Sequence, residues 1–196
     1  MDYDRLKTWV GPTYKRVVRS ESTYKQTEEL LASELTRLLE YYRKLDEKQS
    51  MRLVRDLIDY CLRRFHQYGV KERYGAHYVQ DGFCGSKIFE HLIPQKVLRD
   101  LLLHEQISIK DAMYAPTVWI SEENNSKLRK SGLISTNKDV VFPFRRYLSA
   151  GIDSSFITFR GESIENLSNW SLHDHFHMVF NSAPTLYLNR LNKHDL

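Results

Sequence analysis

Two helical stripes of apolar residues in the first third of the chain constrain the fold most strongly. The first stripe comprises Leu30, Leu31, Leu35, Leu38, Leu39 and Tyr42. The second comprises Leu53, Val54, Leu57, Ile58, Cys61, Leu62 and Phe65. Intervals of three and four residues place such side chains on one face of a helix. Because a polar break at 46–50 separates the stripes, they predict an antiparallel helical hairpin within residues 1–70. Thr23 and Gln26 have capping-box spacing at the start of its first helix.

The remainder of the chain alternates between strand and helix patterns. Strands are predicted at 86–93, 115–120, 155–159 and 185–188, and a helix at 97–103. Ser108 and Ser121 are predicted N-caps, and the helix that Ser121 begins is predicted to stop at Gly132. These patterns predict an α+β fold in which the helical hairpin precedes strands and helices at 84–132 and a mixed α/β portion at 133–196.

Size and composition predict one domain spanning residues 1–196. The hydrophobic share of 41% and charged share of 28% are ordinary for a globular protein. The formal net charge of +4 permits a polyanionic partner without establishing one. The N-terminus has no secretory pattern, and no stretch approaches the roughly 18 apolar residues of a membrane span. Two cysteines without a CxxC pair argue against a cysteine zinc site and favour the cytoplasm.

The segment Phe89-Glu90-His91-Leu92-Ile93-Pro94 is the strongest candidate for chemistry. Adjacent side chains of a strand point to opposite faces, so Glu90 and His91 can take different tasks. A carboxylate on the strand and an amide on a following helix, supplied by Asn124 or Asn125, would hold a Mg²⁺-like ion. An imidazole on the other side would accept a proton from the attacking water. This combination suits hydrolysis of a phosphodiester.

Residues 84–132 resemble the HNH endonuclease family, whose fold is the ββα-metal unit. Phe-Glu-His-Leu-Ile-Pro-Gln at 89–95 is similar to the Asp-His-Ile-x-Pro element, and Trp119-Ile120-Ser121-Glu122-Glu123-Asn124-Asn125 to the strand-then-helix segment that carries the metal-binding Asn. The resemblance implies His91 as general base, and Glu90 with Asn125 or Asn124 as ligands of Mg²⁺ or Mn²⁺. It also implies cleavage of DNA in preference to RNA. Such small nucleases are common in bacterial or phage genome-conflict systems.

The same residues also have a structural interpretation. Glu90 can form a salt bridge on an edge strand, His91 can be a hydrogen-bonded histidine, and Pro94 can simply end the strand. Asn124 and Asn125 can be ordinary residues of a first helical turn. On this interpretation the chain is a non-catalytic interaction protein. It would bind a protein partner or nucleic acid through the helical hairpin and a basic face, and the hairpin could also form a homodimer.

Three further groups are candidates for binding. Lys127, Arg129 and Lys130 would lie near a phosphate backbone if Asn125 holds a metal, and otherwise form a solvated helix face. Arg145 and Arg146 lie between aromatic residues and could bind phosphate, or could pair with Asp or Glu in a structural turn. His173, His175 and His177 would share one face of a strand and could bind a metal, whereas a helix would scatter them. They could also form a polar loop–strand junction, or supply phosphate contacts or a supporting partner to the Glu90 site.

Overall fold

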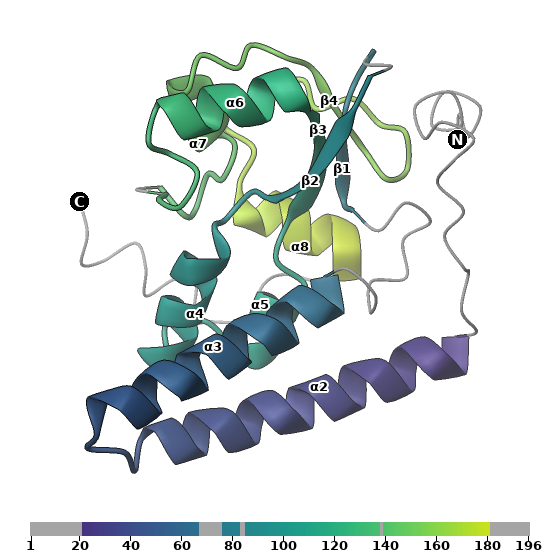
Figure 1. Ribbon diagram of the computed structural model, residues 1–196. Helices are drawn as coiled ribbons and strands as arrows, with labels where there is room; N and C mark the ends of the chain where they lie inside the picture. The colour runs from purple at the N-terminus through teal and green to yellow at the C-terminus, as the bar shows by residue number, and fades with distance from the viewer. Residues whose placement is uncertain (1–20, 67–75, 83–84, 138, 181–196) are drawn as a thin grey trace.

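The predicted N-terminal helical hairpin is present. The computed structural model describes residues 21–66, 76–82, 85–137 and 139–180. Helices α2 (Glu21–Tyr42) and α3 (Lys48–Arg64) run antiparallel and in contact, at the bottom of Figure 1. The predicted capping box is wrong, because Thr23 lies inside α2, where its carbonyl accepts a hydrogen bond from the Thr27 hydroxyl at 2.8 Å.

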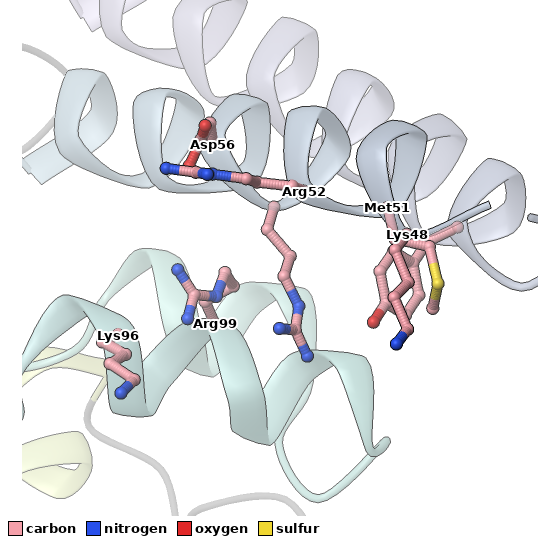
Figure 2. A pocket seen from close by; sticks show the side chains of 8 residues that line it. Lys48, Met51, Arg52, Asp56, Lys96 and Arg99 are labelled. Atoms are coloured by element: carbon pink, nitrogen blue, oxygen red, sulfur yellow. The ribbon is translucent and has the colours of Figure 1, made fainter.

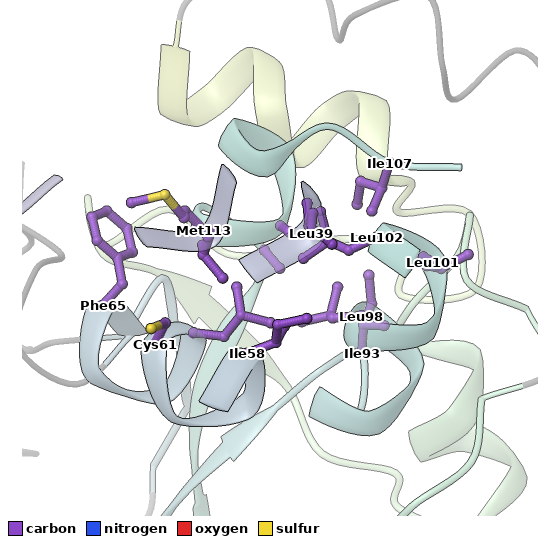
Figure 3. Close-up of a cluster of buried hydrophobic side chains, with 14 of the residues drawn as sticks. Leu39, Ile58, Cys61, Phe65, Ile93, Leu98, Leu101, Leu102, Ile107 and Met113 are labelled. Carbon is purple, nitrogen blue, oxygen red and sulfur yellow. The ribbon is translucent and has the colours of Figure 1, made fainter. Parts of the chain in front are cut away.

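The inward stripes of the hairpin form one hydrophobic core with α4 (Gln95–Leu103), α5 (Ile109–Met113) and α8 (Leu172–Phe180). Figure 3 shows this core, in which Leu39 of α2 and Ile58 of α3 pack with Leu98 of α4. Burial of such side chains stabilises the fold by about 1.5–3 kcal/mol each. Most residues of the predicted stripes are therefore packing residues, whereas Leu30, Leu53 and Leu57 of the same stripes are exposed.

A four-stranded mixed sheet lies above helices α2 and α3 in Figure 1. Its strands are β1 (Tyr78–Gln80), β2 (Lys87–His91), β3 (Thr117–Ser121) and β4 (Phe156–Thr158), in the order β2-β3-β1-β4. β2 and β3 are antiparallel, β3 and β1 are parallel, and β1 and β4 are antiparallel. The predicted α+β fold with N-terminal helices is confirmed, although β1 was not predicted.

A second hydrophobic core joins the sheet to α6 (Glu122–Lys130) and α7 (Arg145–Ser149). α6 follows β3 directly and contacts both β2 and β3. Ser121 caps α6 as predicted, its hydroxyl accepting a hydrogen bond from the backbone N–H of Asn124 at 3.1 Å. Gly132 follows the helix with a φ of 72°. The predicted strand–strand–helix order is present, with α4 and α5 inserted between the strands.

One predicted strand is shorter in the structure. β2 ends at His91, because Pro94 is already the N-cap of α4. Residues 173–177, for which the sequence left strand and helix open, lie in helix α8. The strand predicted at 185–188 lies outside the described residues. Of the helices in the described ranges, none has the length and apolar content needed to cross a membrane.

Candidate active site

The end of β2 sends Glu90 and His91 to opposite faces of the sheet. In the antiparallel pairing with β3, Glu90 lies opposite Val118 and His91 lies opposite Thr117. Val118 belongs to the core that includes α6 and α7, so Glu90 points into that layer. His91 points to the other face, where it meets the end of α3. The predicted divergence of the two side chains is thus present.

His91 is the first member of a chain of two imidazoles. Its Nε2 lies 2.9 Å from Nδ1 of His66, and Nε2 of His66 lies 3.0 Å from the carbonyl oxygen of Ala112. A carbonyl only accepts, so Nε2–H of His66 donates to it, and Nδ1 of His66 must accept from Nε2–H of His91. This assignment leaves the lone pair of His91 on Nδ1. The neighbouring imidazole therefore sets the tautomer and orientation of His91.

Burial keeps both imidazoles neutral. It lowers the pKa of His66 to about 4. It also lowers the pKa of His91 well below its usual value, an effect that the nearby His66, Arg63 and Arg146 reinforce. At neutral pH His91 therefore has its ring lone pair available to accept a proton.

Glu90 is held by Arg146 of α7. Nη2 of Arg146 donates to Oε1 of Glu90 at 2.6 Å, and the Arg146 side chain has no exposed surface. Burial raises the pKa of Glu90, and the adjacent guanidinium partly offsets that rise. Arg146 was predicted as a nucleic-acid contact. Because Arg146 is buried and ion-paired, it lies away from any nucleic acid strand that would bind at the protein surface.

The two asparagines of α6 take different positions. The Asn124 side-chain amide donates to Oε1 of Gln80 at 2.9 Å and to the Ser154 hydroxyl at 3.0 Å, which ties α6 to the end of β1. The structure therefore does not bring that amide group to Glu90. Asn125 is also buried, and within the described residues its Oδ1 has no hydrogen-bond partner. Arg129, one turn further on the same helix face, lowers the pKa of Glu90.

The remaining predicted cations divide into exposed and paired groups. Arg129 and Lys130 are exposed at the end of α6, while Lys127 forms an ion pair with Glu123 at 3.1 Å. Arg145 pairs with Asp139 at 2.7 Å and also donates to the carbonyl of Ser168. The structural interpretation therefore describes Arg145, and Arg129 and Lys130 are the predicted cations that face solvent.

The three alternating histidines do not share a face, because they lie on helix α8. His173 and His177 are exposed and stacked, with ring centroids 6.5 Å apart. His175 points inward, accepting from the Tyr78 hydroxyl at 2.8 Å and donating to the carbonyl of Tyr114 at 2.8 Å. Burial lowers its pKa to about 4. The helical alternative considered for this segment therefore applies, and the three histidines do not form one metal site.

Two buried histidines were missed by the sequence interpretation. His66 follows Leu62 by four residues, so the apolar stripe of α3 already placed it on the buried face. His77 lies beside Thr117, with Nδ1 3.0 Å from the hydroxyl, and its ring centroid is 4.8 Å from that of His175. No signal pointed to His77, because β1 itself was not predicted.

The arrangement combines an oriented neutral imidazole with a partly buried carboxylate on the opposite face of one strand, next to a helix whose Asn125 amide oxygen has no hydrogen-bond partner among the described residues. In comparisons with known proteins, no family model matches the chain, and neither a curated protein nor a solved structure matches it.

Proposed function

We propose that this protein is a metal-dependent endonuclease of the HNH-like kind, which hydrolyses phosphodiester bonds in nucleic acid, in DNA rather than RNA, at the end of β2. The observation that carries the proposal is the chain from His91 through His66 to the carbonyl of Ala112. A base oriented by a second group, itself anchored, is an arrangement that favours general-base catalysis. The antiparallel β2–β3 pair followed by the packed helix α6 supports the same proposal.

His91 is the group that accepts the proton. With Nε2–H directed at His66, Nδ1 is the nitrogen that takes a proton from an attacking water. A pKa well below the usual value makes His91 a weaker base, but one that is fully deprotonated at neutral pH. Arg63 of α3, whose charge reaches His91, adds positive potential on the side from which a phosphate would approach.

Glu90 and Asn125 are the residues that would hold a divalent cation, Mg²⁺ or Mn²⁺. The donor types fit, because carboxylate and amide oxygens are the protein ligands these ions prefer. The buried Oδ1 of Asn125 without a hydrogen-bond partner in the described residues also fits. The ion pair with Arg146 uses Oε1 of Glu90 and leaves Oε2 outside it. When bound, such a cation stabilises the charge that develops on the phosphate and on the leaving oxygen. Asn124 is left out of this proposal, because its amide holds Gln80 and Ser154.

The test is digestion of plasmid DNA and of RNA with Mg²⁺ or Mn²⁺, comparing the wild type with His91→Ala. We expect the variant to lose about 10²–10⁴-fold in rate, the usual contribution of a general base, while circular dichroism shows the fold retained. His104→Ala is the matched control, since His104 is an exposed histidine whose ring, among the described residues, bonds only the Asp100 carbonyl of its own helix, and it should cleave normally. Equal nicking by the wild type and His91→Ala would reject His91 as the base.

A second candidate function is non-catalytic binding of nucleic acid through the helical hairpin. The observation that favours it is a cluster of cationic side chains between α3 and α4. A cytoplasmic location is part of either proposal and rests on the two cysteines without a CxxC pair. Docking of a protein partner or a second copy on the hairpin remains a proposal with the exposed Leu53, Leu57 and Tyr60 of α3 as its basis.

A further inference from the structure

A pocket of about 690 Å³ opens between the first half of α3 and the start of α4. Tyr42 at the end of α2 and Met51 of α3 supply its apolar surface. Figure 2 shows Lys48, Arg52 and Asp56 of α3 on one side of the space and Lys96 and Arg99 of α4 on the other. The pocket is separate from the end of β2, because Arg52 precedes His66 by fourteen residues along α3 and its terminal turn.

The charge in this pocket is one-sided. Its charged side chains are Lys48, Arg52, Arg55, Lys96, Arg99 and the single carboxylate Asp56. Arg99 is neutralised from outside the lining, by Asp59 at 2.6 Å and by Asp100 at 3.0 Å. Within the described part of the chain, no ion pair joins Lys48, Arg52 or Lys96 to a carboxylate. With Arg99 neutralised, the lining therefore holds four cationic groups and one acidic group.

Arg55 adds a more specific signal. It is partly buried in the wall of the pocket, with its guanidinium 5.8 Å from the centre of the Tyr42 ring. Its Nε atom is buried and has no hydrogen-bond partner among the described residues. A buried donor without an acceptor is unfavourable, and an anionic oxygen that enters the pocket would satisfy it.

The spacing of the cations fits a linear anion better than a single small one. Lys48, Arg52 and Arg55 follow one another at four and three residues on one face of α3, so neighbours rise by about 6 and 4.5 Å along the axis. Lys96 and Arg99 form a parallel row on α4. Guanidinium forks bind phosphate oxygens in pairs, and an aromatic ring beside them offers a face on which a base can stack.

We infer that the α3–α4 pocket binds consecutive phosphate groups of a nucleic acid strand. Arg52, Arg55, Lys48 and Lys96 contact the phosphates, and Tyr42 lies beside a base. Arg99, fixed by its two carboxylates, forms the floor. Further along α3, Arg63 leads from this pocket toward His91, so a bound strand reaches both places. The site deepens the proposed function by naming where the nucleic acid is held, but binding here does not require cleavage.

The experiment measures fluorescence anisotropy of labelled single- and double-stranded oligonucleotides with chelator present, so that no cleavage enters the readout. The variant Arg52→Glu/Lys96→Glu should bind at least about tenfold more weakly than the wild type. The slope of log affinity against log salt should fall by about 1.4–1.8, as expected for two lost phosphate contacts. Both residues are exposed, and circular dichroism verifies the fold.

The matched control is Lys25→Glu/Arg37→Glu on α2, which makes the same change in net charge at exposed positions. It should retain nearly the affinity of the wild type. Equal weakening by the two double variants, or no weakening by Arg52→Glu/Lys96→Glu, would overturn the site. Competition by inorganic pyrophosphate or a mononucleotide as strong as by an unlabelled strand would overturn the strand as its ligand.

The two proposals fail separately. His91→Ala should bind the labelled strand as the wild type does, since His91 lies outside the pocket. A loss of cleavage in His91→Ala with binding retained tests the proposed active site at the end of β2. A loss of binding that is confined to Arg52→Glu/Lys96→Glu tests the proposed binding site in the pocket.

Discussion

The end of β2 and the α3–α4 pocket both concentrate titratable side chains, but they treat charge in opposite ways. At the end of β2, Glu90 is paired with a fully buried Arg146, and His91 is kept neutral by burial beside His66. In the pocket, Lys48, Arg52 and Lys96 face solvent without an ion pair in the described residues. Buried charge is tied to the stability of the fold, whereas exposed charge of one sign is available to a partner.

The largest expected effect is a loss of stability at acidic pH, caused by the buried histidines. Burial lowers the pKa of His66 and of His175 to about 4 each, against about 6.5 in the unfolded chain. Between these values the unfolded state binds protons that the folded state does not, so the free energy of unfolding falls as the pH falls from 6.5 toward 4. Each group contributes about 3 kcal/mol to this loss, and above pH 6.5 their contribution is constant.

Urea denaturation at a series of pH values measures this dependence. The raised pKa values of Glu90 and Asp59 act in the opposite direction, since burial favours their protonated forms, and they reduce the net slope. A profile that stays flat down to pH 4.5 would show that the inward histidines are not held neutral.

The next effect concerns the buried ion pair. Glu90→Ala leaves the guanidinium of Arg146 buried without its carboxylate, and we expect a loss of about 3–5 kcal/mol in the free energy of unfolding. Glu123→Ala removes the exposed partner of Lys127 and should cost no more than about 0.5 kcal/mol. Glu90→Leu/Arg146→Met should recover most of the loss. If Glu90→Ala and Glu123→Ala unfold at the same denaturant concentration, burial of the Glu90–Arg146 ion pair does not affect the free energy of unfolding.

A smaller effect is expected for the imidazole chain, and it rests on the proposed nuclease activity. His66→Ala removes the acceptor that orients His91, so cleavage should slow by about 10–100-fold, of the order found for groups that orient another functional side chain. It also removes a neighbour that lowers the pKa of His91, so the acidic limb of the pH–rate profile should move to higher pH. A slower variant with an unmoved limb would mean that His66 acts only through the fold.

The smallest effect on stability belongs to the exposed side of the comparison. Arg52→Ala and Lys96→Ala should each change the free energy of unfolding by less than about 0.5 kcal/mol, because neither side chain is buried or paired within the described residues. Thermal unfolding measures this directly. A larger loss in either variant would assign these cations to the packing of α3 on α4 rather than to binding.

Local sequence patterns predicted much of the fold. The apolar stripes located α2 and α3, and Ser108, Ser121 and Gly132 marked helix boundaries where the structure has them. These signals succeed because they depend on neighbours within about one helical turn. They failed for β1 and α8, whose short apolar runs carry no period long enough to decide between helix and strand.

The sequence by itself determined that Glu90 and His91 diverge on one strand, since adjacent strand residues always do. Only the tertiary structure decided their partners: Arg146 is 56 residues from Glu90, and His66 is 25 residues from His91. It also turned His175 inward and collected cations of α3 and α4 around one pocket. A pattern in the chain reports which side of an element faces the core, whereas the path of the chain between elements sets which two faces meet.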